Sequence, residues 1–310
     1  MITGARPAKF RGIFRDDAAA RGVYSEAAGI QRRMPRAVAV PADAEDVVVL
    51  VKWAASTGAT LVPRGSGSSM AGGAIGDGVI VDLSRLRTIG EVDVAARRVR
   101  AGPGVLLGAL DEHVAPHGLR FPVDPSSWSF CTVGGVAATN AAGARSVRVG
   151  SVRDWITALD CVFADGSRAE LRRGAAPPNV RPVRRFLDSY ADALREGESA
   201  APARHGGVRK ESSGYATSRW AETGDLVDLF VGSEGTLALF VGVELALEPA
   251  PDAAASLLAA FSSLEGAVTA AATAREAGAA ACELLDRTFL DVVAAGPLPV
   301  TIDPDTEAVL

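Results

Sequence analysis

The residues best suited to chemistry in this chain form a glycine-rich loop between two short apolar segments. From Pro63 to Leu83 the sequence reads PRGSGSSMAGGAIGDGVIVDL. Glycine allows sharp turns and a close approach of the backbone to a ligand, and consecutive amides in such a loop can point together at an anion. The loop is therefore a candidate cradle for phosphate groups.

The spacing of these glycines departs from the dinucleotide-binding motif of the Rossmann fold, which is G-x-G-x-x-G at the start of a helix. Gly65 and Gly67 fit its first half, but Met70 stands in place of the third glycine. The residues that follow are too rich in glycine to favour a helix. We therefore expect loop amides, and not a helix N-terminus, to hold a pyrophosphate. Glycines that only form turns are the alternative.

A second candidate for ligand binding is the stretch of residues 120–150. It is dense in Gly, Pro, Ser, Thr and Asn and follows neither the helical nor the strand period. Its backbone groups need partners that a sheet or helix would otherwise supply. A compact domain holds such a long irregular stretch chiefly where it wraps around something, so we expect a ligand there.

The elements around the glycine loop predict how it is positioned. Residues 36–40 favour a strand, Asp43 is suited to cap a helix that ends at Gly58, and residues 60–63 favour the next strand. This β-α-β unit places the loop at the carboxyl end of a strand.

Further along, the pattern mixes helices and strands. Alternation over residues 91–105 predicts a hairpin, residues 106–117 have helical spacing, and Asp165 with Gly166 is a typical hairpin turn. After residue 250 the composition becomes rich in alanine and helical in pattern, which predicts a domain boundary at about that position.

Composition limits the class of protein. The chain has 310 residues, 48% of them hydrophobic, and a formal net charge of −5. This length allows two domains with real cores, and the acidic balance argues against nucleic-acid binding. Neither a signal peptide nor a transmembrane segment is recognisable. We expect a cytoplasmic protein, with a peripheral attachment to a membrane left open.

Cysteine and histidine form no disulfide or metal framework in the sequence. Cys131, Cys161 and Cys282 are far apart and make no C-x-x-C pair. His113 and His117 are four residues apart on a predicted helix, but no third ligand accompanies them. We expect surface or helix-end histidines and no metal site.

Three separated segments together resemble the FAD-binding domain of the FAD-linked oxidase family, also called the vanillyl-alcohol oxidase or PCMH type. They are residues 63–86, residues 124–167 and residues 229–249, the last reading LFVGSEGTLALFVGVELALEP. The similarity covers roughly residues 25–250 and is closest to the branch of glycolate oxidase and D-lactate dehydrogenase.

The resemblance implies an α+β fold. Residues 1–250 would form a PCMH-type FAD-binding domain of two α/β subdomains, about 25–85 and 86–250. Residues 251–310 would be the start of an α+β cap domain, the C-terminal domain of FAD-linked oxidases, and would leave it incomplete.

The resemblance also implies which residues contact FAD. The loop of residues 64–69 would hold the pyrophosphate, the turn at Asp124 with residues 132–152 would line the flavin and ribityl side, and Glu234 with its neighbours would close over the adenine half. The full implied set is Arg64, Gly65, Ser66, Gly67, Ser68, Ser69, Asp124, Pro125, Ser126, Thr132, Gly134, Gly135, Thr139, Asn140, Gly143, Ala144, Gly150, Ser151, Val152, Glu234, Gly235 and Val241.

Some positions depart from the family pattern. Relatives with covalent flavin have a histidine where this chain has Ser68, so non-covalent FAD is expected. Ala238 replaces a usual glycine. Lys210 and Tyr215, in a stretch similar to the family's R-K-x-S-S-G-Y, are weak catalytic candidates, with an ordinary surface loop as the alternative. The His and Glu cluster of the family's cap domain is missing, so the catalytic residues are unknown.

The function that the resemblance implies is an FAD-dependent oxidoreductase acting on CH-OH groups. It would be all or part of a D-2-hydroxy-acid dehydrogenase of glycolate or D-lactate type, moving a hydride from the substrate α-carbon to flavin N5. The electron acceptor would be a quinone, an electron-transfer protein or an iron-sulfur domain. The alternative is an FAD-binding module or subunit, without independent catalysis, that completes its site with another chain.

Overall fold

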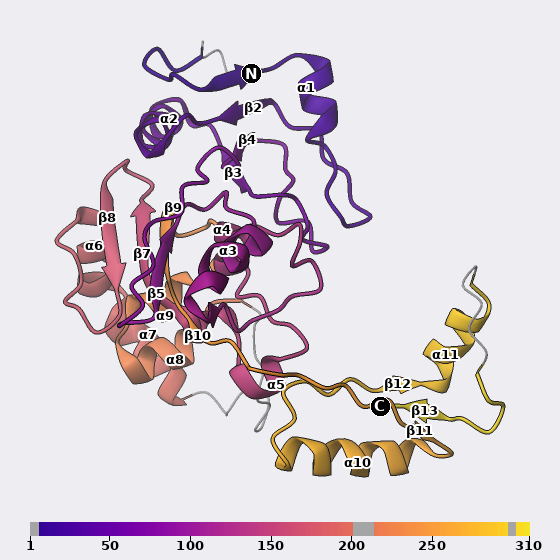
Figure 1. The fold of residues 1–310 in the computed structure, drawn as a ribbon. Helices are drawn as coiled ribbons and strands as arrows, with labels where there is room; N and C mark the ends of the chain where they lie inside the picture. Colours follow the sequence, from indigo (N-terminus) through magenta and orange to yellow (C-terminus); the bar gives the residue numbers. More distant parts are fainter. Residues whose placement is uncertain (1–5, 201–213, 297–301) are drawn as a thin grey trace.

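The computed structural model describes residues 6–200, 214–296 and 302–310. Its body is built on two sheets of four strands, and a small third sheet lies with two helices toward the C-terminal end (Figure 1). The α+β architecture implied by the resemblance is confirmed.

The first sheet carries the glycine loop and has the strand order β1-β2-β4-β3. Strands β2, β4 and β3 run parallel, and β1 pairs antiparallel with β2. The predicted helix between β2 and β3 is confirmed: the Asp43 carboxylate accepts a hydrogen bond from the Asp46 amide, and Gly58 ends the helix with φ 70°. The elements are β1 (Ile13–Arg15), α1 (Ala18–Val23), β2 (Ala37–Val40), α2 (Ala44–Thr57), β3 (Leu61–Arg64) and β4 (Val79–Asp82).

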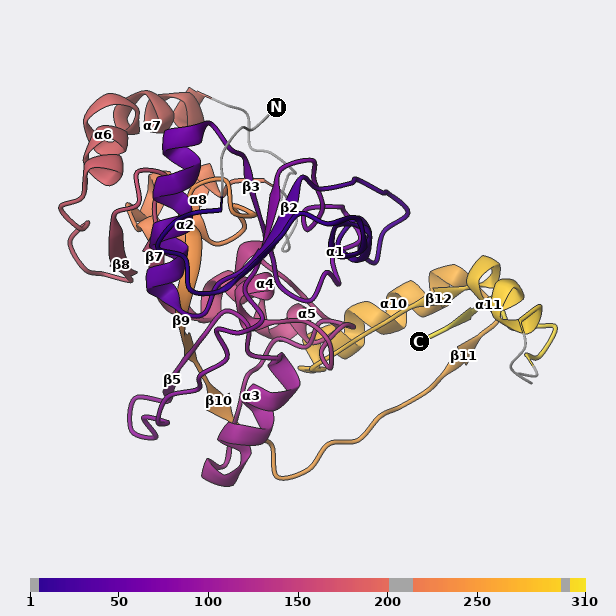
Figure 2. The same cartoon turned by 90° about the horizontal axis from the view of Figure 1, so that it is seen from above.

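The second sheet is antiparallel, with the order β5-β9-β7-β8. The turn between β7 and β8 contains Gly166 at φ 78°, as the hairpin prediction requires. Helices α3, α4, α6 and α7 share one apolar cluster with this sheet, and α2 packs against β7 and β9 through a second cluster (Figures 1 and 2). The elements are β5 (Arg98–Ala101), α3 (Leu107–Val114), η1 (Ala115–His117), β6 (Leu119–Arg120), α4 (Val133–Ala138), α5 (Ser146–Val149), η2 (Val152–Trp155), β7 (Ile156–Val162), β8 (Arg168–Arg172), α6 (Arg181–Ser189), α7 (Ala191–Ala200), α8 (Thr217–Thr223), α9 (Leu226–Phe230), β9 (Leu239–Ala246) and β10 (Glu248–Pro249).

Two sequence predictions need refinement here. The hairpin over residues 91–105 has only one regular strand, β5, because its other arm touches β5 through isolated bridges such as Asp93 with Arg98. The irregular stretch of residues 120–150 contains the short helices α4 and α5. The sequence of α4 is VGGVAA, which has no polar residue. It therefore lacks the pattern of polar and apolar faces that predicts a helix.

A shared core joins the two sheets. One cluster surrounds the second sheet and contains Leu107 and Leu159. The other lies between α2 and the first sheet, and Leu50 packs there with Val162 and Val241 from the second sheet. Because apolar burial is the main stabilising term, this cluster holds the glycine loop at a set distance from the second sheet.

The C-terminal part forms a small sheet of order β11-β13-β12 with helices α10 and α11. It lies beside the body in both views (Figures 1 and 2). Its assignment as the start of a cap domain, like the other domain limits, stays a prediction. In the part of the chain that the structure describes, no helix is both long and apolar enough to cross a membrane. The elements are β11 (Ala260–Phe261), α10 (Leu264–Glu276), β12 (Leu285–Asp286), α11 (Arg287–Ala294) and β13 (Ala308–Val309).

Candidate functional site

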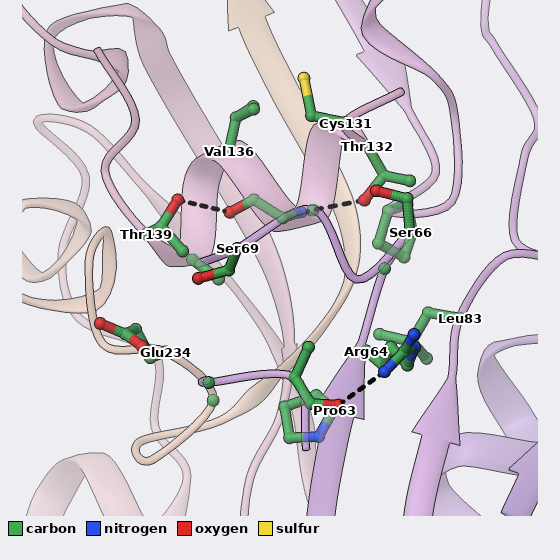
Figure 3. Close-up of a pocket in the computed structure, with 18 of the residues that line it drawn as sticks. Pro63, Arg64, Ser66, Ser69, Leu83, Cys131, Thr132, Val136, Thr139 and Glu234 are labelled. Carbon is green, nitrogen blue, oxygen red and sulfur yellow. Dashed lines mark hydrogen bonds between the residues drawn. The ribbon is translucent and has the colours of Figure 1, made fainter. Parts of the chain in front are cut away.

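A cavity of about 200 Å³ opens where the carboxyl end of β3 faces α4 and the start of β9 (Figure 3). Three segments that are far apart in sequence form its wall: residues 63–74, residues 127–141 and residues 234–240. They coincide with the three segments that carry the family resemblance.

The structure brings many of the predicted residues together around this cavity. The predicted residues that line it are Arg64, Gly65, Ser66, Gly67, Ser68, Ser69, Thr132, Gly134, Gly135, Thr139, Glu234 and Gly235.

The glycine loop lies directly against the N-terminal end of α4. A Cβ atom placed on Gly65 would lie 2.2 Å from Thr132 Oγ1, which is closer than real atoms approach. Gly67 has φ 77°, the left-handed region that favours glycine. Gly65 therefore has no room for a side chain, and the backbone at Gly67 disfavours most residues other than glycine.

Arg64 connects the two ends of this loop. Its Nη1 donates to the carbonyl of Ala74, 3.2 Å away, and to that of Glu26, 2.9 Å away. The guanidinium lies 5.3 Å from the ring centroid of Tyr24. Burial lowers the pKa of Arg64, but an arginine side chain stays charged at neutral pH. The cavity therefore has a fixed positive charge in the wall beside the loop.

Helix α4 forms the opposite wall with small side chains. Thr132 caps it by accepting a hydrogen bond from the Gly135 amide, 3.2 Å from its Oγ1, and Thr139 Oγ1 donates to the Gly135 carbonyl at 3.0 Å (Figure 3). A Cβ on Gly134 would meet Pro103 at 2.5 Å. The absence of side chains at 134 and 135 lets the backbone of this helix approach whatever occupies the cavity.

The third wall is the corner before β9. The Glu234 amide donates to the carbonyl of Ala138 at 2.9 Å, with Glu234 itself at φ 51°. Gly235, at φ 79°, has room for no Cβ because Pro63 would lie 2.2 Å away. Contact with both α4 and the loop fixes the corner and places the Glu234 carboxylate beside the cavity.

The remaining predicted residues lie outside the cavity lining. Asp124 forms an ion pair with Arg145, with 2.8 Å between Oδ2 and Nε, and buried Asn140 accepts a hydrogen bond from the Arg153 amide at 2.9 Å. Val241 belongs to the core described above. The predicted residues that do not line the cavity are Asp124, Pro125, Ser126, Asn140, Gly143, Ala144, Gly150, Ser151, Val152 and Val241.

Of the two weak catalytic candidates, the structure describes only Tyr215. Lys210 lies outside the described residues. Tyr215 is 44% exposed, and its hydroxyl is 2.6 Å from Thr236 Oγ1, so it stands next to the corner of the third wall. Its catalytic role stays a prediction.

Several lining residues escaped the sequence reasoning because they are apolar or carry no motif. Cys131 is the one with chemical potential: it is buried, and burial raises the pKa of its thiol. A raised pKa keeps the thiol protonated and poorly reactive. The lining residues missed are Pro63, Gly73, Ala74, Leu83, Pro103, Ser127, Cys131, Val136, Ala138, Ala141, Ala238, Leu239 and Phe240.

The donor set suits a long dinucleotide better than a small charged metabolite. Glycine backbone lies on two opposing walls, and among the described lining residues the titratable side chains are Arg64, Cys131 and Glu234. Most of the surface offered is therefore backbone amide, hydroxyl and apolar atoms. Such a wall can hold a phosphate group at the glycine loop and an uncharged ring system elsewhere.

Comparison with known proteins agrees with this geometry. Residues 35–172 match the FAD_binding_4 family, described as an FAD binding domain. The glycolate oxidase subunit GlcD of Bacillus subtilis is 28% identical over 94% of this chain and 50% of its own length. The D-lactate dehydrogenase of Anaerostipes hadrus is 30% identical over 79% of this chain and 43% of its own.

Solved structures show the same fold. An alkyldihydroxyacetonephosphate synthase superposes with a TM-score of 0.62 at 20% identity, covering 85% of this chain and 46% of that protein. The chain spans about half the length, or less, of the curated relatives it matches. Residues 35–172 therefore match an FAD-binding domain of the FAD_binding_4 type, and the chain is a homologue of glycolate oxidase subunits and D-lactate dehydrogenases over half of their length or less.

Proposed function

We propose that the cavity holds FAD, with the pyrophosphate on the amides of residues 65–69 and the rest of the cofactor between α4 and the Glu234 corner. The observation that carries this proposal is the facing pair of glycine walls, in which a Cβ on Gly65 or Gly134 would collide with Thr132 or Pro103. Bound FAD would supply a two-electron acceptor for hydrogen from a substrate carbon.

We infer that FAD is held without a covalent bond. Ser68 occupies the position at which covalent relatives carry a histidine, and a hydroxyl in water is a poor nucleophile. The Cys131 thiol also lines the cavity, but its raised pKa leaves little thiolate to react. Acid treatment of the flavin-loaded protein should release all of its FAD into the supernatant.

For the reaction, we propose that the chain is all or part of a D-2-hydroxy-acid dehydrogenase of glycolate or D-lactate type. The names of the similar proteins support this substrate class. The electron acceptor would be a quinone, an electron-transfer protein or an iron-sulfur domain. Residues 251–310 would belong to the cap domain over the flavin.

A second candidate function is an FAD-binding platform that completes its site with another chain. The observation that favours it is that few of the described lining side chains can transfer a proton. Arg64 and Cys131 stay protonated at neutral pH, which leaves Glu234 as the candidate base. On this reading the base for the substrate hydroxyl lies elsewhere.

One experiment separates the two candidates. The purified chain is loaded with FAD, and its visible spectrum is recorded under anaerobic conditions before and after adding D-lactate, glycolate or D-2-hydroxyglutarate. Bleaching of the flavin bands by one of these acids supports the dehydrogenase. Bands that persist with every acid favour the platform, and a folded protein that takes up no FAD contradicts both.

A further inference from the structure

A cluster of three side chains lies beside the glycine loop, and one of them, Arg64, also lines the cavity. Tyr24 follows α1, Arg64 ends β3, and Asp82 ends β4. Arg64 and Asp82 are neighbours in the parallel register of β3 and β4, and the Tyr24 hydroxyl donates a hydrogen bond to Asp82 Oδ2. Asp82 is 8% exposed, and its other oxygen accepts a bond from the Ser84 amide at 2.8 Å.

The guanidinium of Arg64 lies within this cluster and is bound on several sides. The ring of Tyr24 covers it at 5.3 Å, and its Nη1 donates to the carbonyls of Glu26 and Ala74 at 2.9 and 3.2 Å. Both arginine and lysine can place a cation over an aromatic face, but only the planar guanidinium can stack on the ring while its N–H groups donate in the guanidinium plane. The side chain thereby ties the start of the loop to its end and to the segment after α1.

The same segment touches the middle of the loop. The Ala28 amide donates to the carbonyl of Gly67 at 3.0 Å. A Cβ on Gly67 would lie 2.4 Å from Arg64 Nη2, so the guanidinium lies directly against the turn at this residue. The left-handed backbone of Gly67 is therefore supported from one side by Ala28 and from the other by Arg64.

We propose that Arg64, covered by the Tyr24 ring that Asp82 anchors, is a positioning residue that keeps the glycine loop in the shape that retains FAD. It acts through the loop backbone and not as a ligand of the phosphate. The proposal rests on the proposed function, because it needs FAD in this cavity. It also makes the segment after α1, which does not line the cavity, a determinant of cofactor affinity.

Conservative replacement separates this role from direct binding. If Arg64 acted through its charge on the phosphate, Arg64→Lys would retain most of the affinity. If it acts as a brace, lysine fails because its compact ammonium has no plane to stack on Tyr24 while it donates to the carbonyls that Arg64 Nη1 binds. We expect Arg64→Lys to raise the Kd for FAD by about tenfold or more, the size of a lost hydrogen bond to a charged group.

Two further readouts depend on the brace alone. Tyr24→Ala should weaken FAD binding to a similar degree, and the double variant with Arg64→Lys should bind little worse than the weaker single variant, since both disrupt one unit. Arg64→Met and Arg64→Lys should raise the Kd to a similar degree, because both remove the planar guanidinium, whereas a role through charge alone predicts that lysine keeps the affinity that methionine loses.

The measurement is a fluorescence titration of the full-length apo-protein with FAD. Arg36→Lys, at an exposed site of the same sheet, serves as the matched control and should leave the Kd unchanged. Circular dichroism of each apo-protein checks folding, and Tyr24→Phe, which keeps the ring over Arg64, gives a milder test if Tyr24→Ala unfolds.

The outcomes are distinct. Near-normal affinity in Arg64→Lys, additive losses in the double variant, or a much larger loss in Arg64→Met than in Arg64→Lys would overturn the brace and make Arg64 a direct phosphate ligand or a bystander. Failure of the unchanged, folded protein to bind FAD would instead overturn the proposed function.

Discussion

Gly65 and Thr132 are in direct contact across the join between the two sheets. A Cβ on Gly65 would lie 2.2 Å from Thr132 Oγ1, and that same oxygen accepts the capping hydrogen bond from the Gly135 amide at 3.2 Å. The glycine loop and α4 are thus fitted to each other through one hydroxyl, and the cavity lies beside this contact.

Replacement of Gly65 by alanine should therefore separate the two walls. We expect Gly65→Ala to weaken FAD binding by at least about tenfold and to lower the free energy of unfolding by about 1 to 3 kcal/mol, the range for overpacking. The measurements are an FAD titration and urea unfolding of the apo-protein. The matched control is Gly197→Ala in the exposed part of α7, where a Cβ meets nothing, so the stability should stay equal or rise. Unchanged FAD affinity in Gly65→Ala would contradict the fit of loop and helix.

Gly67 offers a test of where the phosphate binds. Gly67→Asp puts a carboxylate at the loop, where it would repel a phosphate held by the same amides. We expect the purified variant to carry no FAD while its circular dichroism stays native.

Gly67→Asn separates charge from shape, because asparagine has nearly the same size and also tolerates the left-handed conformation. It should retain clearly more FAD than the aspartate variant. Equal FAD content in the two variants would argue against a phosphate at this loop.

Buried Asp228 ties α9 to the residue after β8 and to the end of α8. Its carboxylate accepts a hydrogen bond from Arg173 at 2.8 Å and from Thr223 at 2.9 Å, and its side chain has no exposed surface. Removing one partner of a buried ion pair leaves the other charge unpaired. We expect Asp228→Asn to lower the free energy of unfolding by about 3 kcal/mol in urea titrations.

An exposed ion pair should behave differently. Asp291 pairs with Arg287 one turn apart on α11, and Asp291→Asn should cost less than about 1 kcal/mol. If the two variants lose equal stability, the buried ion pair of Asp228 contributes no more than the exposed one.

The lowered pKa of Glu244 predicts that the protein loses stability in acid. Arg172 and Thr157 hold the Glu244 carboxylate, which lowers its pKa from 4.5 to about 2. A carboxylate with a lowered folded-state pKa stabilises the fold above its unfolded pKa and loses that contribution as the pH falls toward the folded value. The free energy of unfolding should therefore fall by about 2 to 3 kcal/mol between pH 4.5 and pH 2 through this group.

Glu244→Gln removes the titrating group and should flatten that part of the pH profile of unfolding, followed by urea titration at each pH. The exposed Glu276→Gln on α10 serves for comparison and should leave the profile unchanged. A Glu244→Gln profile as steep as that of the unchanged protein would refute the assignment.

Sequence patterns predicted the local elements and the glycine loop well. The helix from Asp43 to Gly58 was predictable because its cap residue, its apolar spacing and its terminal glycine all act within the segment itself. The hairpin turn at Gly166 was predictable for the same reason.

Contacts between distant segments were not predictable in this way. Nothing in the residues near Gly65 shows that Thr132 will press against it, and nothing near Arg64 shows that Tyr24 will cover its guanidinium. Family resemblance supplied the three wall segments, yet it also placed Val241 beside the cofactor, whereas the packing of the sheets puts this side chain in the core. Apolar lining residues such as Phe240 carry no signal until the fold closes the cavity.

The most direct test of the central claim is an FAD titration of the purified full-length apo-protein, with folding followed by circular dichroism. The predicted result is saturable binding of an equimolar amount of FAD, a visible flavin spectrum, complete release of FAD by acid, and loss of binding in Gly67→Asp. A folded protein that binds no FAD, or binds it equally well in Gly67→Asp, would contradict the assignment of the cavity.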